Sequence, residues 1–367
     1  MSHQAGERVG VGDNESLFYL HTPSSGHKPT LVFINALVGQ TEMWEGLIGE
    51  TLRDQGYGTL SYNFRGQIDS NFNTSTELTP KLIVDDLLKL LNEIKPYKPV
   101  LVGLSIGGLF AAQAIESGVV AEGLVLINTL RKSSVRLDWI NESTSRAFSL
   151  GGRQLLMDLM APMLINPDKL SELRADALEE VRYEPVSVKD GHMNLMRNAA
   201  SADWDFPWQN LIVPTLVMTG HHDRVFLVED DISELSSKIS DVKRANFDNA
   251  GHLIPMERPI EFNKEILNSL DKEIIMKARK FLVNQQSDFD RKGETDNVFD
   301  GGVGYGSSYS HPDLSNTYHA LEALHYTKEL VKDVQGEVLD LDWGAAITFV
   351  SNCQQRSESN KQEWVSK

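Results

Sequence analysis

The 367-residue sequence contains one cysteine, Cys353, which excludes an internal disulfide framework. It has no apolar run near the roughly 20 residues that a membrane helix needs. Its start, MSHQAGERVGVGDN, has no apolar segment typical of a signal peptide. These absences predict a cytoplasmic protein without a membrane span. Cys353 has no base close to it in the sequence, so we interpret it as an ordinary, half-buried thiol.

Clusters of basic residues are also missing. The net charge is −17, and the acidic residues are spread along the chain. Nucleic acids and anionic membrane surfaces bind concentrated Lys and Arg side chains, so neither is an expected partner. The hydrophobic fraction of 41% is enough for a packed core, and the length suggests about two domains.

Apolar strand candidates alternate with helical patterns through residues 1–270. A hairpin is expected in ERVGVGDNESLFYLHT, and the later strand candidates are rich in Val, Ile and Leu, as in parallel strands covered on both faces. These strands are expected at 31–35, 58–64, 99–104, 123–128, 215–220 and 243–248, and helices at 41–55, 78–94, 105–117, 229–239 and 259–270. The order predicts an α/β domain with a mostly parallel sheet and helices on both faces.

One interval, about residues 133–210, interrupts this alternation. It holds two or three helical patterns and no convincing strand, and it is too long for an ordinary connection, so we predict a helical cap. Methionines could line an adaptable acyl pocket there, although packing of the cap onto the sheet is the favoured interpretation. Five of the ten methionines lie in this interval: Met157, Met160, Met163, Met193 and Met196.

The stretch VLVGLSIGGLF, residues 100–110, places Ser105 between Gly103 and Gly107 where a buried strand becomes a helix. Small residues on both sides of the serine let the strand and the helix approach closely, and the sharp turn projects the serine side chain outward. Because the turn also opens a helix, backbone N–H groups can stabilise a developing oxyanion. This context favours Ser105 as a nucleophile.

A nucleophilic serine needs a base and a group that orients the base. Asp223 follows a strand candidate in TLVMTGHHDRVF, and His252 follows the last strand candidate in NAGH. Asp223 could also be a helix N-cap or a loop carboxylate. The adjacent His221 and His222 suggest a metal, but neighbouring histidines rarely meet at one ion without further ligands. No metal and no cofactor are therefore expected.

The chain resembles the α/β-hydrolase superfamily over residues 7–270, on GLSIG, GHHD, NAGH and the arginine-glycine turn in NFRGQIDS. The resemblance implies an α/β-hydrolase fold with a cap. It also implies that Ser105 is the nucleophile, that His252 is the general base and acid, and that Asp223 orients His252.

The loop after the first core strand departs from the superfamily pattern. Relatives usually have His-Gly there, whereas FINALVG has Asn35 and Ala36. The expected oxyanion-hole donors are the N–H groups of Leu37 and Ile106. Because alanine lacks the access of glycine to positive φ, the loop is expected to bend differently.

Residues 271–367 resemble part of the repeat of squalene cyclases and prenyltransferases, on FLVNQQ, DGGVGYG and DLSNTYHALEAL. A segment of this length cannot close the ring of helical hairpins of that fold, and no Asp-rich acid motif or zinc-ligand set is evident. We therefore predict an all-α extension without cyclase or transferase chemistry. It could be a remnant or truncated fusion, a docking segment for a protein partner, or a plain helical extension.

Taken together, these residues predict a serine hydrolase that cleaves a small carboxylic ester, lactone or thioester through an acyl-enzyme on Ser105. Two alternatives stay open. The same three residues could transfer the acyl group to an alcohol, or the domain could bind a ligand without catalysis.

Overall fold

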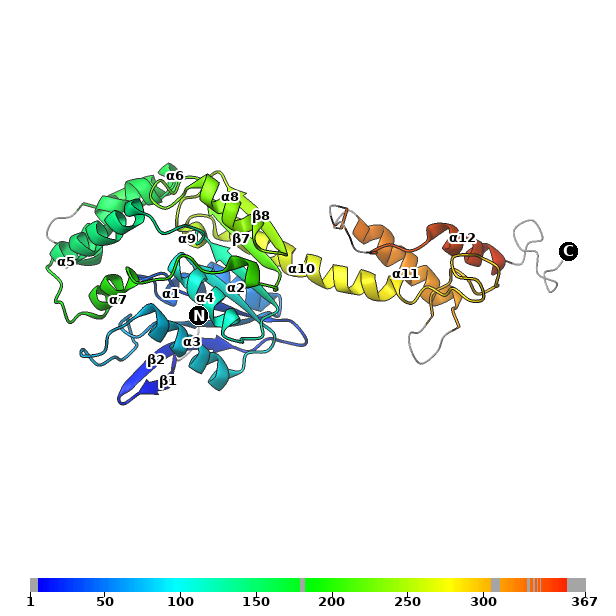
Figure 1. Ribbon diagram of the computed structural model, residues 1–367, viewed down its shortest axis with the longest axis horizontal. Coiled ribbons are helices and arrows are strands. Elements are labelled where there is room, and N and C mark those ends of the chain that lie inside the picture. Colours follow the sequence, from blue (N-terminus) through cyan, green and yellow to red (C-terminus); the bar gives the residue numbers. More distant parts are fainter. Residues whose placement is uncertain are drawn as a thin grey trace. The chain divides into compact units, whose positions relative to one another are not determined.

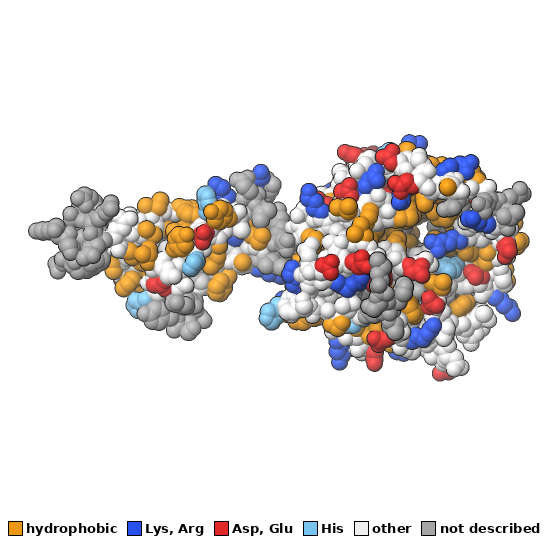
Figure 2. Space-filling view, turned by 180° about the vertical axis from the view of Figure 1, so that it is seen from behind, with side chains coloured by type: hydrophobic (Ala, Val, Ile, Leu, Met, Phe, Trp, Pro, Cys, Tyr) orange, Lys and Arg blue, Asp and Glu red, His pale blue; other side chains and the backbone are white. Residues whose placement is uncertain are grey.

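The structure is a computed structural model that describes residues 6–178, 182–304, 311–328, 331–332, 334, 336 and 338–354. The chain divides into two compact units, Met1–Ile266 and Leu267–Lys367. No helix in the described ranges is both long and apolar enough to cross a membrane. On the face shown in Figure 2, basic side chains are interspersed with acidic ones.

The first unit is built on an eight-stranded sheet with the order β1-β2-β4-β3-β5-β6-β7-β8 (Figure 1). β1 and β2 form the predicted hairpin, β2 pairs antiparallel with β4, and all other neighbouring strands are parallel. The strands lie within two residues of the predicted ranges: β1 Glu7–Gly12, β2 Glu15–Thr22, β3 Thr30–Ile34, β4 Gly58–Tyr62, β5 Pro99–Leu104, β6 Gly123–Ile127, β7 Thr215–Gly220 and β8 Val242–Phe247.

The inner strands are buried on both faces, as their apolar sequences predict. All five residues of β3 are buried, and so are all five of β6. Because side chains on a strand alternate between the two faces, this burial requires a layer of helices on each face. The fold class predicted from the sequence is therefore confirmed.

The helices of the first unit follow the predicted order, with one added short helix at Ile254–Glu257 and two large differences in bounds. Gly46 divides the helix expected at 41–55 into two, and α10 continues beyond residue 270 because its sequence contains no later Gly or Pro to end it. The helices outside the cap are α1 Glu42–Glu45, α2 Leu47–Asp54, α3 Pro80–Ile94, α4 Ile106–Glu116, α8 Glu229–Ser237, α9 Ile254–Glu257 and α10 Pro259–Val283.

The interval predicted to be a cap contains α5 Val135–Leu164, α6 Pro167–Leu173 and α7 Gly191–Ala199, and α5 and α6 lie together beside the sheet layer in Figure 1. Gly151 and Gly152 have non-helical dihedral angles and kink α5. Met193 and Met196 are buried and pack with Phe148 and Leu156 against Leu37 and Val38, on the loop after β3. These contacts favour packing as the role of the two methionines.

The second unit has a small hydrophobic core of its own. It contains α11 Leu314–Thr327 and α12 Trp343–Asn352. Asp313 caps α11 by accepting a hydrogen bond from the Asn316 N–H, as its sequence predicts. Cys353 is exposed, so the expected half-buried thiol was wrong. The core is formed by Val303, Ala320, Leu324 and Leu341, with Leu282, Val283, Leu321 and Trp343 packed against it.

Candidate active site

Ser105 occupies a strained turn between β5 and α4. Its φ of 57° and ψ of −122° lie in a region that L-residues seldom adopt, and its N–H donates to the Ile127 carbonyl at 2.8 Å. A Cβ on Gly103 would lie 2.4 Å from Gly108 Cα, and one on Gly107 would lie 2.5 Å from the Ile34 carbonyl oxygen. The turn therefore requires both glycines, as the sequence predicts, and it presents the serine at the carboxyl edge of the sheet.

Asp223 and His252, predicted to act together, are hydrogen bonded. Asp223 follows β7, His252 follows β8, both are buried, and Asp223 Oδ2 lies 2.6 Å from His252 Nδ1. With the carboxylate as acceptor, a neutral His252 ring carries its proton on Nδ1, which leaves the Nε2 lone pair free to accept a proton. The other carboxylate oxygen, Oδ1, accepts the N–H groups of Val225 and Phe226 at 3.0 and 2.9 Å.

The environment of Asp223 favours its charged form. Burial raises the pKa of the carboxyl, but the charge and hydrogen bond of His252, the Phe226 N–H and the positive charge of Arg131 outweigh that effect. The pKa of Asp223 is therefore held below its ordinary value. A carboxylate that stays ionised can orient the imidazole and stabilise the imidazolium that forms when His252 takes a proton.

Asn128, at the end of β6, fixes the backbone that carries His252. Its side-chain amide donates to the carbonyls of Gly251 and His252 at 3.0 and 2.9 Å, and its Oδ1 accepts the Gly220 N–H at 2.9 Å. One side chain thus connects the ends of β6 and β7 to the histidine loop. The sequence analysis did not identify Asn128, since its only signal is its place as the last residue of a strand candidate.

Glu257 is a second buried support of the histidine loop. One of its carboxylate oxygens accepts the N–H groups of Asn166 and Gly251 at 2.7 and 2.9 Å, and the other accepts that of Leu253 at 3.0 Å. Hydrogen bonds from three N–H donors stabilise this buried carboxylate. The loop is thereby tied to the segment that follows α5.

The side chain of Asn35 points into the protein and organises the loop after β3. Its Oδ1 accepts the Trp44 indole N–H at 2.7 Å, and its Nδ2 donates to the Tyr62 carbonyl at 2.9 Å and to Gln67 Oε1 at 3.0 Å. Ala36 is not among the residues with positive φ, so this loop does not need the backbone freedom of glycine. The expectation that this loop bends differently from that of its relatives stays a prediction.

The two predicted oxyanion donors, the N–H groups of Leu37 and Ile106, have no hydrogen-bond partner among the described residues. Gln67 Nε2 binds the carbonyls of Ala36 and Leu37 at 2.8 and 3.0 Å, which fixes the peptide groups of this loop. Ile106 is the first residue of α4, where N–H groups have no partner in the helix.

Arg131, which the sequence analysis missed, lies beside the serine. Its Nη2 donates to Ser105 Oγ at 3.1 Å and to the Asn128 carbonyl at 2.7 Å. Among the described contacts, no hydrogen bond joins Ser105 to His252. The structure therefore brings together Asp223 and His252, and it places a guanidinium beside the serine hydroxyl.

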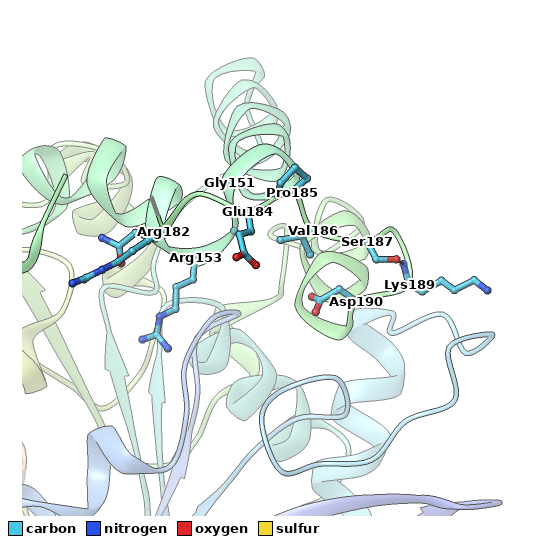
Figure 3. Close-up of a pocket in the computed structure, with 11 residues that line it drawn as sticks. Gly151, Arg153, Arg182, Glu184, Pro185, Val186, Ser187, Lys189 and Asp190 are labelled. Carbon is cyan, nitrogen blue, oxygen red and sulfur yellow. Dashed lines mark hydrogen bonds between the residues drawn. The ribbon is translucent and has the colours of Figure 1, made fainter. Parts of the chain in front are cut away.

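The remaining candidate features lie outside this cluster. His221 Nδ1 lies 2.7 Å from Asp248, and the described residues include no group of three or more His, Cys, Asp or Glu side chains suited to a metal ion. A pocket of about 540 Å³ opens in the cap between segments 151–154 and 182–190 (Figure 3). Its lining includes none of the predicted catalytic residues, so we do not assign the reaction to it.

Comparison with known proteins agrees with this architecture. A family model described as alpha/beta hydrolase fold matches residues 29–259. The sequence is 24% identical to 3-oxoadipate enol-lactonase 1 of Acinetobacter baylyi over 238 residues, which cover 64% of this chain and 85% of the relative. It is 21% identical to an uncharacterized carboxylesterase, nap, of Bacillus subtilis over 263 residues, 69% of this chain and 83% of the relative.

Two solved structures illustrate the same similarity. The enol-lactonase from Burkholderia xenovorans LB400 has a TM-score of 0.60 at 23% identity, and the match covers 72% of this chain and all of that one. A thermophilic esterase from Thermogutta terrifontis has a TM-score of 0.61 at 22% identity, with 73% of this chain and 98% of that one covered.

Proposed function

The chain belongs to the alpha/beta hydrolase fold family, and on that premise we propose that it is a serine hydrolase of carboxylic esters, lactones or thioesters. The observation that carries the proposal is the buried pair of Asp223 and His252 at the sheet edge where the strained turn presents Ser105. Relatives named as an enol-lactonase and a carboxylesterase support ester-bond hydrolysis.

In the proposed reaction, Ser105 Oγ attacks the carbonyl carbon while His252 Nε2 takes the hydroxyl proton. The N–H groups of Leu37 and Ile106 receive the negative charge on the carbonyl oxygen. His252 then protonates the leaving alcohol or thiol, and the acyl group stays on Ser105. Water attacks this ester by the same path, releases the acid and restores the serine.

The first step requires the serine hydroxyl to turn from Arg131 toward His252. Catalytic hydrogen bonds are often long or absent before a substrate binds, so the present contact is compatible with catalysis. Rotation about the Cα–Cβ bond of Ser105 would move its oxygen away from Arg131.

The test is reaction with a fluorophosphonate probe together with hydrolysis of p-nitrophenyl esters. We expect Ser105→Ala to abolish labelling, and Ser105→Ala and His252→Ala each to lower kcat by several orders of magnitude, with a smaller but large loss for Asp223→Asn. Ser117→Ala, at the exposed C-terminal end of α4, is the control and should match the wild type.

Other outcomes distinguish the alternatives. If Ser105 is labelled and the acyl group is transferred to an added alcohol as a new ester, with little free acid, the protein is an acyltransferase. A protein that is neither labelled nor active would be a binding module. Near-normal turnover of Ser105→Ala would show that the proposed nucleophile is wrong.

A further inference from the structure

Arg131 is a buried cation for which the described residues supply no ion pair. Arg131 is only 6% exposed, and no carboxylate of the described chain lies within 4.0 Å of its guanidinium. A buried charge is destabilising unless a charge of opposite sign and hydrogen bonds compensate for the lost hydration, so a buried cation without an ion pair is seldom retained for packing alone. The position beside Ser105 suggests that the missing partner is a ligand.

Two aromatic rings lie against this guanidinium. The Arg131 Cζ atom lies 4.7 Å from the Trp204 ring centroid and 4.3 Å from that of Phe226. Stacking occupies the faces of a guanidinium and leaves its N–H groups directed along its edges. A planar group such as a carboxylate binds to those edges.

The edge donors of Arg131 are only partly used. Nε donates to the Thr129 carbonyl at 3.2 Å, and Nη2 donates to the Asn128 carbonyl and to Ser105 Oγ. No acceptor of the described chain is bonded to Nη1. A ligand oxygen could therefore bind Nη1 and also replace the serine as an acceptor of Nη2.

The guanidinium keeps its charge at neutral pH. Burial lowers the pKa of Arg131 to about 10, and the nearby charge of Asp223 acts in the opposite direction. A value near 10 leaves almost every molecule protonated at pH 7.

We propose that Arg131 binds a carboxylate of the substrate close to the scissile bond, so that the enzyme prefers esters or lactones that carry a carboxylate. The inference rests on the proposed hydrolase function and names its substrate class. A fixed guanidinium fork recognises carboxylates with two charge-assisted hydrogen bonds. The same contact draws Nη2 away from Ser105 Oγ and frees the hydroxyl to donate to His252.

Geometry limits the distance between the carboxylate and the reacting carbonyl. Nη2 lies 3.1 Å from Ser105 Oγ. The attacked carbon must come within about 3–3.5 Å of that oxygen. A carboxylate on Arg131 is therefore separated from the carbonyl carbon by only a few bonds. Short half-esters of dicarboxylic acids satisfy this limit on the acyl side, and esters of short hydroxy acids satisfy it on the alcohol side.

Two pairs of esters test the proposal and distinguish these two sides. Monoethyl succinate is compared with ethyl butanoate, and O-acetylglycolate with ethyl acetate, by following proton release. We expect the wild type to prefer the charged member of at least one pair by about ten-fold or more in kcat/KM, because an unpaired polar site rejects the analogue that lacks its partner.

Arg131→Met removes the charge and keeps most of the length of the side chain. It should remove this preference, and a rise in KM for the charged ester should account for most of the change. Arg131→Lys should restore part of the preference. Lys132→Met is the matched control and should keep the ratio within two-fold, because the Lys132 ammonium is already paired with Glu234 and Asp231.

The two proposals fail in different ways. Hydrolysis that depends on Ser105 but shows no preference for either charged ester would refute the role of Arg131 and leave the hydrolase function intact. An unchanged ratio of kcat/KM between the charged and the uncharged ester in Arg131→Met would also refute the role of Arg131. If that variant fails to fold by circular dichroism, the ratio in Arg131→Lys decides. Absence of both hydrolysis and fluorophosphonate labelling would refute the hydrolase function itself, and the substrate class with it.

Discussion

Replacing Gly103 by alanine tests whether the position of Ser105 depends on close contact between β5 and α4. The added Cβ would lie 2.4 Å from both Cα and N of Gly108 and 2.5 Å from the Gly107 carbonyl carbon. All three are backbone atoms, so no side chain can rotate to make room. Carbon atoms in contact lie about 3.5–4.0 Å apart, so the strand and the helix must separate by about 1 Å.

The size of the effect follows from this displacement. Overpacking of a close-packed interior lowers the free energy of unfolding by about 1–3 kcal/mol. We expect a value near the upper end, because the added Cβ meets backbone atoms that cannot rotate away. For a domain of this size, each kcal/mol lowers Tm by about 2–4 °C, so we expect a fall of about 6–12 °C. A displacement of about 1 Å at a nucleophile costs about 100-fold in rate.

The assay combines thermal unfolding, followed by tryptophan fluorescence, with the second-order rate of labelling by a fluorophosphonate. Gly123→Ala is the matched control, since Gly123 is also a buried strand glycine but its Cβ would lie 3.4 Å or more from its neighbours. Gly103→Ala should lower both Tm and the labelling rate relative to this control. Equal values for the two variants would refute the argument that close backbone contact positions Ser105.

Three further predictions concern Asn128, the charge of Asp223 and removal of the second unit. Asn128→Gly keeps a residue that tolerates the φ of 48° but loses three hydrogen bonds, so kcat should fall by about 10–100-fold with a smaller change in KM; an unchanged kcat would contradict the role of Asn128. Because the pKa of Asp223 is lowered in the folded state, its charge stabilises the protein above its unfolded pKa of about 3.9, and this contribution is lost as pH falls through the folded pKa. The stability difference between wild type and Asp223→Asn, measured by urea unfolding, should therefore shrink as the pH falls below about 4. A chain that ends at Asp271 retains Phe262 and Ile266, the fully buried α10 residues of the first unit, and should hydrolyse esters within a few-fold of the full chain; an insoluble product would show that the second unit completes the first.

The features that could be predicted from the sequence depend on local patterns. Runs of Val, Ile and Leu identified the inner strands, because a parallel strand that is buried on both faces is mostly apolar. The glycines around Ser105 predicted a tight turn, and the positions of Asp223 and His252 after strands predicted that they meet at one edge. Each inference uses residues close to one another in the sequence and one rule of parallel sheets.

The features that could not be predicted depend on contacts between distant segments. Glu257 accepts hydrogen bonds from Asn166, 91 residues earlier, and Asn128 binds His252, 124 residues later. Nothing around either residue in the sequence identifies its partner. Arg131 was missed for the same reason, since it precedes a helix of the cap and only folding places it against Ser105.

The histidine loop depends on the cap as well as on the sheet. The His252 N–H donates to the Leu164 carbonyl at 2.6 Å, at the end of α5, and Glu257 joins the N–H groups of Asn166 and Gly251 through one oxygen. Any opening of the cap that displaced residues 164–166 would therefore also displace His252. Because Nδ1 of His252 is held by Asp223, such a movement would break the arrangement that activates the base. An active arrangement of His252 therefore requires this end of α5 to be in place.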